Sequence, residues 1–126
     1  MERLFWICLA GAAGTGARYL ISLWAGERLG TALPFGTLIV NLLGCFLISF
    51  LMYLGLNLAS FPTTLRLALT TGFLGGLTTY SSFNYETTRL LHDGAPRAAL
   101  TNLGVTLGGC FVAGLLGLAV ARRLLG

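Results

Sequence analysis

Two rows of neutral polar side chains lie within apolar stretches of this 126-residue chain. Each row repeats every four residues, and together they comprise Thr37, Asn41 and Cys45, then Asn102, Thr106 and Cys110. A four-residue repeat places side chains on one helix face, so each row predicts a polar stripe. Hydroxyl, amide and thiol groups donate hydrogen bonds without a formal charge. Such stripes suit an anion that is held weakly and released, or they bond neighbouring helices together. The spacing alone leaves both interpretations open.

The stretch GGLTTYSSFNYET, residues 75–87, places two glycines and a block of hydroxyls inside an apolar segment. Gly75 and Gly76, followed by Thr78 and Thr79, predict an interruption near the middle of a helix. Non-helical backbone at membrane depth is tolerated only where it is buried in protein or lines water. Freed carbonyls can bind a cation, and the N-terminus of a half-helix can face an anion. A glycine-rich kink without an ion site is the alternative.

Aromatic and charged side chains follow the interruption. Tyr80 and Phe83 are three residues apart and share a helix face. Because the edge of an aromatic ring is positive, two such edges can bracket an anion, although ordinary packing is the commoner use. Glu86 is expected either to pair with Arg89 or to lie at a pore mouth. Arg18, near the end of the first apolar segment, is expected in a structural or vestibule role.

The composition requires a lipid environment. The chain is 56% hydrophobic and 10% charged, with a mean hydropathy of +0.83, whereas soluble domains carry about 25% charged residues. All eight basic residues are arginines, and they are scattered, so a nucleic-acid footprint is absent. The cysteines Cys8, Cys45 and Cys110 fit neither a zinc nor a disulfide pattern, and we interpret them as small packing residues.

Four apolar stretches are long enough to cross a bilayer. They cover about residues 4–24, 34–58, 62–91 and 96–121 of a single domain, 1–126. We therefore predict an all-α, multi-pass protein of the cell membrane, with four transmembrane helices and the third broken near its middle. Pro34 suits a helix start, and we expect the N-terminus to be retained as the first helix.

Positive charges are nearly balanced across the predicted membrane. Four crossings put both chain ends on one side of the membrane. The arginines near the helix ends on that side are Arg3, Arg66, Arg122 and Arg123, and those on the opposite side are Arg28, Arg89 and Arg97. The positive-inside rule needs an imbalance, so we expect insertion in both orientations; one fixed topology with a weak bias is the alternative. Two opposed copies can form a two-fold dimer.

Small residues four apart permit close helix contact, either inside one subunit or between two copies. The sequence offers two such pairs, Gly72 with Gly76 and Gly104 with Gly108.

Three motifs resemble those of one family, the Fluc or CrcB fluoride channels. GGLTTYSSFNYE resembles the family signature GGxTTFSTF, GTLIVNLLGCF resembles its second-helix motif with the pore Asn, and GARYL resembles its first-helix Arg motif. The resemblance covers the whole chain, with the motifs in the family's order and spacing.

The resemblance implies a fluoride-selective channel that exports cytoplasmic fluoride passively. It also implies an antiparallel, dual-topology homodimer with two pores and a structural sodium ion at the dimer interface. Carried onto this sequence, the sodium ligands are the carbonyls of Gly75 and Thr78. The pore positions fall on Asn41, Thr37, Tyr80, Phe83, Ser81, Ser82, Thr106 and Cys110, with Asn102 a weaker match. Tyr80 stands where Phe is usual, Ser82 where Thr is usual, and Cys110 where Ser is common.

Other function classes fit less well. A small proton-coupled multidrug exporter needs a carboxylate deep in its first helix, and the first segment has no Asp or Glu between Arg3 and Glu27. A scaffold subunit would explain the glycines but not the two polar rows. An enzyme is not expected, because the single histidine, His92, falls in a predicted loop and no nucleophile–base constellation is present.

Overall fold

The computed structural model describes residues 1–126, and the chain is helical throughout, without strands. The elements are α1 (Glu2–Leu29), α2 (Phe35–Asn57), α3 (Thr63–Leu67), the π-helical turn η1 (Ala68–Leu74), α4 (Gly75–Leu77), α5 (Tyr80–His92) and α6 (Pro96–Leu125). Helices α1, α2 and α6 are each long and apolar enough to cross a membrane. The segments from α3 to α5 form the remaining crossing in two pieces. The predicted all-α class with a broken third segment is therefore confirmed.

Prolines and glycines set the helix ends. Pro34 and Pro62 directly precede α2 and α3, and Pro96 is the first residue of α6. Proline fixes φ and lacks the N–H that an early helical residue would leave unbonded, so it suits these positions. Gly30 after α1 and Gly94 after α5 have φ values of 83° and 76°, a conformation that favours glycine. The connections between crossings are consequently short and tightly turned.

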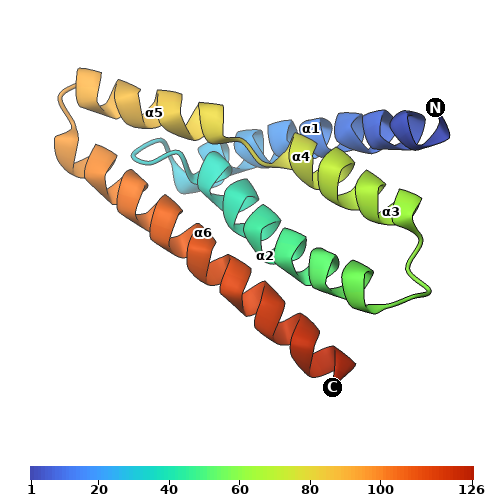
Figure 1. Cartoon of the computed structure of the whole chain (residues 1–126). Coiled ribbons are helices and arrows are strands. Elements are labelled where there is room, and N and C mark those ends of the chain that lie inside the picture. Colours follow the sequence, from blue (N-terminus) through green and yellow to red (C-terminus); the bar gives the residue numbers. More distant parts are fainter.

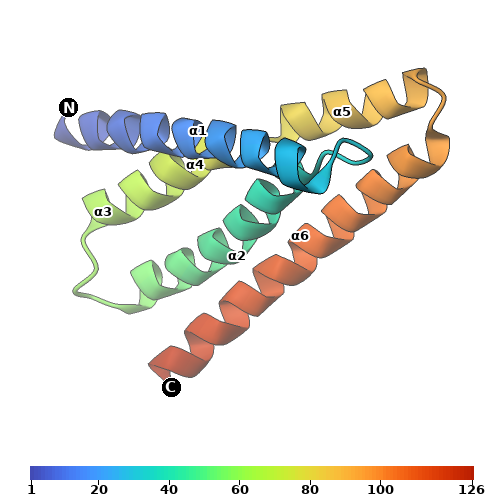
Figure 2. The ribbon, with the colours of Figure 1, turned by 180° about the vertical axis from the view of Figure 1, so that it is seen from behind.

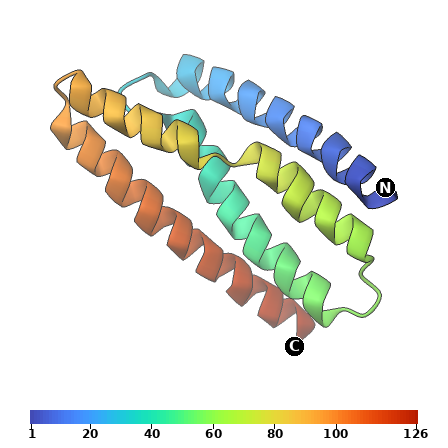
Figure 3. The same ribbon diagram turned by 45° about the horizontal axis from the view of Figure 1, so that its top comes forward.

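The broken crossing joins two packing units. Helix α1 packs along η1 and α4, whereas α6 packs along α2 and against α5. Helix α2 lies between these units and contacts both. Figure 1 shows the N- and C-termini at the same end of the molecule, and the reverse view in Figure 2 shows the same arrangement from behind. In Figure 3 the first half of the broken crossing lies beside α1, while the second half continues toward the start of α6.

The interruption lies after the glycines rather than at them. Gly75 and Gly76 are helical, and Gly75 has φ −62° and ψ −37°. The chain leaves the helix at Thr78 and Thr79, which are both extended, with ψ values of 154° and 117°. The predicted interruption is confirmed at Thr78 and Thr79, and the part of the prediction that placed Gly75 and Gly76 in it was wrong. They remain helical, and Gly76 serves close contact with α1.

Glycines bring η1 and α4 into backbone contact with α1. A Cβ atom at Gly14 would collide with the carbonyl of Phe73, and one at Gly76 would collide with the carbonyl of Gly11. A Cβ at Gly72 would lie 2.6 Å from the carbonyl oxygen of Ile7. The glycine pair at 72 and 76 therefore packs within one subunit. The pair at 104 and 108 meets nothing within 4 Å and lies on the exposed side of α6.

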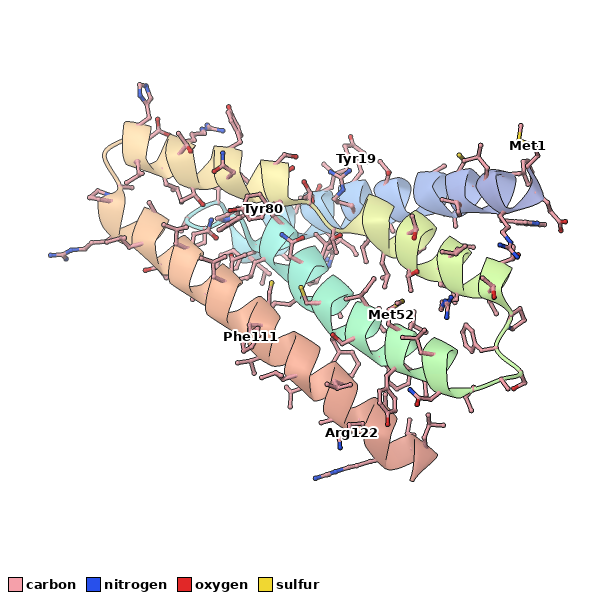
Figure 4. All side chains as sticks on the ribbon, viewed as in Figure 1. Met1, Tyr19, Met52, Tyr80, Phe111 and Arg122 are labelled. Carbon is pink, nitrogen blue, oxygen red and sulfur yellow. The ribbon has the colours of Figure 1, made fainter.

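Much of the surface is apolar. Only 19 of 126 residues are buried, and large side chains such as Tyr80 and Phe111 are 72% and 70% exposed. Figure 4 shows Phe111 on the outer side of α6 and Tyr80 at the start of α5. Lipid or another protein chain must cover such a surface.

Replacing Gly14 by Ala tests the backbone contact between α1 and η1. The added methyl group meets a carbonyl that the packed helices hold in place, and overpacking of this kind costs about 1–3 kcal/mol. Gly16→Ala is the matched control on the same helix, because nothing lies within 4 Å of that position. We expect equilibrium unfolding in detergent to show a lower free energy of unfolding for Gly14→Ala only. Equal stability of the two variants would contradict the close contact.

Candidate functional site

Asn41 holds the break in the third crossing. Its side-chain Nδ2 donates to the carbonyl of Thr79 at 3.0 Å, and its Oδ1 accepts from the amide of Thr79 at 2.8 Å. Asn41 is only 8% exposed. A backbone amide and carbonyl left unbonded at this depth would each cost free energy. The side chain replaces both helical hydrogen bonds that Thr79 lacks, and one amide hydrogen of Asn41 stays free for another partner.

Further hydrogen bonds fix the two helix ends at the break. Arg18 Nε donates to the carbonyl of Gly76 at 2.9 Å, which satisfies a group at the end of α4. The Thr79 hydroxyl accepts from the amide of Ser82 at 3.2 Å and so caps the start of α5. Arg18 thus contacts the break through the backbone, which fits the structural role expected for it. The N-terminus of α5, with its positive end, is held near the middle of the crossing.

The two polar rows face each other. Helices α2 and α6 run in the same direction (Figure 3) and pack closely, since a Cβ at Gly109 would lie 3.1 Å from Leu42 Cδ2. One offset of 65 positions relates all members of the two rows, Thr37 to Asn102, Asn41 to Thr106 and Cys45 to Cys110. The last two pairs line one cavity together, whereas Thr37 and Asn102 each hydrogen-bond to a residue of α5. In a parallel pair, a constant offset keeps partners at matching heights. Asn41, Cys45, Thr106 and Cys110 therefore form a ladder of neutral donors between α2 and α6.

A cavity of about 260 Å³ opens where this ladder meets the break. It is lined by Asn41, Cys45, Thr78, Thr79, Tyr80, Phe83, Thr106, Leu107 and Cys110. The rings of Tyr80 and Phe83 meet edge to face, with centroids 5.5 Å apart and planes at 71°. Phe83 is 2% exposed. The structure thus brings five of the eight predicted pore residues to one cavity, with two aromatic rings on its wall.

A second, wider cavity of about 470 Å³ lies one helical turn away along α2. Thr37 and Glu86 both line it, and the Thr37 hydroxyl donates to Glu86 Oε1 at 2.8 Å. The other carboxylate oxygen, Oε2, is buried and has no hydrogen-bond partner. Arg89 pairs with Asp93 at 3.5 Å, so the alternative that paired it with Glu86 was wrong. Glu86 lines this cavity, and its expected place at a pore mouth stays a prediction.

Asn102 connects α6 to the turn that carries Phe83. Its Nδ2 donates to Thr87 Oγ1 at 2.8 Å, and Thr87 in turn donates to the carbonyl of Phe83 at 2.8 Å. Asn102 Oδ1 accepts from the Thr106 hydroxyl over a long 3.4 Å. Asn102 is 2% exposed. This side chain therefore positions the aromatic residue, while the weakly engaged hydroxyl of Thr106 is left beside the cavity.

Comparison with known proteins places the chain in a family. Residues 5–118 match the family described as "CrcB-like protein, Camphor Resistance (CrcB)". The chain belongs to the CrcB family. A relative from Sorangium cellulosum (strain So ce56) is 50% identical over 125 residues, which is 99% of this chain and 98% of the relative. One from Citrifermentans bemidjiense is 48% identical over 124 residues, 98% of this chain and all of the relative.

A third CrcB relative, from Anaeromyxobacter sp. (strain K), is 47% identical over the full length of both chains. All three carry the name "Fluoride-specific ion channel FluC". The resemblance found in the three sequence motifs is therefore confirmed. The family consists of ion channels rather than enzymes, and the present chain is a multi-pass protein of the cell membrane.

Some residues of this CrcB chain lie elsewhere than expected. Ser81 is exposed and Ser82 is half-buried, and both hydroxyls lie next to that of Thr79, at 3.3 and 3.1 Å, rather than in the cavity lining. Conversely, Thr79 and Cys45 line the cavity, although the family resemblance did not place them in the pore; Cys45 belongs to the first polar row. The capping role of Thr79 has a sequence signal, since threonine is a favoured residue directly before a helix start.

Asn41→Ala tests whether this side chain holds the break. The change leaves the amide and carbonyl of Thr79 without partners, at a cost of about 1–3 kcal/mol for each group. Asn57→Ala is the matched control on the same helix, because Asn57 makes only an exposed bond to the carbonyl of Tyr53. We expect faster hydrogen exchange at Thr79 and a lower free energy of unfolding in Asn41→Ala alone. Unchanged exchange at Thr79 would show that the break does not depend on Asn41.

Proposed function

We propose that this chain forms a fluoride-selective channel that lets cytoplasmic fluoride leave the cell passively. The observation that carries the proposal is the cavity in which neutral donors of α2 and α6 meet two aromatic rings beside a braced helix break. The fluoride channels named among the relatives support the same conclusion. Selectivity follows from a narrow path whose donors replace the hydration shell of a small anion.

The proposed path passes from the wider cavity to the narrower one along α2. Fluoride meets the hydroxyl of Thr37 first, then the free amide hydrogen of Asn41, and then the edges of Phe83 and Tyr80. Beyond the rings, Thr106 and Cys110 continue the row on α6. Two hydroxyls on this path already donate to a protein acceptor, Thr37 to Glu86 and Thr106 to Asn102. Each must exchange its acceptor for fluoride, so the ion is bound without being trapped.

We also propose that two copies assemble antiparallel, with one path in each. The nearly balanced arginines allow both orientations, and the exposed face of Tyr80 offers apolar surface for a partner. A sodium ion at the two-fold axis would be held by the carbonyls of Gly75 and Thr78 from both copies. These carbonyls suit the ion, because hard cations bind oxygen ligands. Neither carbonyl accepts a hydrogen bond from a side chain or from backbone outside the helices.

Fluoride efflux from liposomes tests the function. Liposomes with the purified protein should release fluoride, read by a fluoride electrode, and should retain chloride.

Tyr80→Phe should still conduct, since the ring edge remains. Phe83→Ile should slow efflux about tenfold, because losing one ring-edge contact of about 1–1.5 kcal/mol has that effect on a rate.

Size-exclusion chromatography must first show that each variant is folded. Complete loss of flux in Tyr80→Phe would contradict the role given to the two rings. Absence of fluoride release from well-folded wild-type protein would overturn the channel proposal. That result would favour the exporter or the scaffold as the function of the chain.

Tags at each terminus test the antiparallel assembly. If the chain inserts both ways, each tag should be reached by a membrane-impermeant reagent from both sides of the cell membrane in comparable amounts. A terminus that is accessible only from the cytoplasm would exclude dual insertion.

Exchange of all sodium for N-methyl-D-glucamine should reduce fluoride efflux, and an unchanged rate would exclude the proposed sodium site.

A further inference from the structure

Two of the three cysteines face each other at the narrower cavity. Cys45 on α2 and Cys110 on α6 both line it, and both are half-buried and outside any disulfide. Cys8 is exposed on α1 and lines neither cavity. The proposed fluoride path uses Cys110 only as a weak donor and makes no use of Cys45. The pairing of these two thiols therefore needs a separate explanation.

The helix contact brings the two thiols together. They share the 65-residue offset that relates the two polar rows, and both line the narrower cavity. Gly109 directly precedes Cys110, and Gly114 lies one turn later. A Cβ at Gly114 would lie 3.2 Å from Ser49 Oγ and 3.6 Å from the carbonyl oxygen of Cys45. The absence of side chains at these glycines lets α6 approach α2 closely at the height of the thiols.

The donor set selects a particular class of metal ion. Thiolates are soft ligands and prefer soft cations over sodium, magnesium or calcium. Structural zinc takes four protein ligands, and the chain has no group of three or more His, Cys, Asp or Glu side chains that could hold a metal. Two thiolates alone satisfy the soft d10 ions Cu(I), Ag(I) and Hg(II), which form linear two-coordinate complexes. The pair fits this class and no harder ion.

We propose that Cys45 and Cys110 form a two-thiol site for a soft d10 metal ion, and that the bound ion closes the path through the cavity. The ion would lie beside Asn41, Phe83 and Thr106 in a space of about 260 Å³. With Cu(I) or Ag(I), two thiolates leave a net negative charge there, which repels an anion. With Hg(II) the site is neutral and the obstruction is steric. The closure, but not the metal site, rests on the proposed fluoride channel.

Mercuric chloride is a suitable probe, because it is neutral and can enter a cavity lined by neutral side chains. Each thiol loses its proton as its sulfur bonds to mercury, and the two mercury–chloride bonds break. Two protons and two chloride ions leave for each mercury bound, as expected when thiols become metal ligands. Nothing is oxidised or reduced.

The binding test uses the full-length protein with Cys8→Ala as the working background, which leaves only the two facing thiols. Intact-protein mass should show one mercury gained and two hydrogens lost per chain. Chelation by two linked thiols should require roughly 100-fold more competing monothiol for removal than binding by one thiol. The matched controls are Cys8→Ala with Cys45→Ala, and Cys8→Ala with Cys110→Ala. Equal retention of mercury in the background and in either control, or a loss of two hydrogens without mercury, would overturn the site.

Fluoride efflux then tests the closure. Each variant is compared with its own rate before mercury, so slow variants remain informative. Efflux is measured after treatment with enough competing monothiol to remove singly bound mercury. Mercuric chloride should then still abolish efflux in the Cys8→Ala background and leave it in Cys8→Ala with Cys45→Ala. Binding without loss of efflux would support the site and overturn the closure. If the protein releases no fluoride even before mercury is added, the channel proposal and the closure fail together, and the mass measurement still decides the metal site.

Discussion

The paired hydrogen bonds between Asn41 and Thr79 are the contact on which this architecture depends. A crossing that leaves its helix at membrane depth exposes backbone groups that lipid cannot satisfy. Asn41 bonds to both groups of Thr79, and Arg18 bonds to the carbonyl of Gly76. These bonds let the third crossing end one helix and start another inside the membrane. The cavity exists because the chain turns there and presents Phe83 and Tyr80 from a second helix.

The two halves of the broken crossing belong to different packing units. The first half is held against α1 by glycine contacts at 14, 72 and 76. The second half is tied to α6 through Asn102 and Thr87. The backbone at the break has little room to move, because both of its flanking halves are held. Backbone contact holds the first half, and a buried side-chain network holds the second. The geometry of the cavity is thus fixed by contacts outside it.

The sequence predicted the fold class because its signals are local. Apolar length, the prolines at 34, 62 and 96, and the four-residue repeats all depend on neighbours along one helix. The facing of the two rows also followed once α2 and α6 proved parallel. Local sequence signals could not predict the exact position of the break. Gly75 and Gly76 look like helix breakers, yet their use depends on the approach of α1, a contact distant in sequence.

The candidate site was predictable by residue type more than by role. Asn41, Phe83 and Thr106 do reach one cavity, but the sequence could not show that Asn41 also binds the backbone of Thr79. Ser81 and Ser82 carry hydroxyl groups of the kind that a pore lining needs. In the structure both hydroxyls lie beside the hydroxyl of Thr79 at the start of α5 instead. Such roles depend on hydrogen-bond partners that are far apart in the chain, and residue spacing along one helix does not predict these partners.

The order of the bracing residues along the chain has a bearing on how the protein is made. Arg18 and Asn41, which bond to the break, both precede it in sequence. A ribosome delivers them into the membrane before residues 76–79 emerge. The non-helical backbone of the break therefore enters a bilayer that already holds its hydrogen-bond partners.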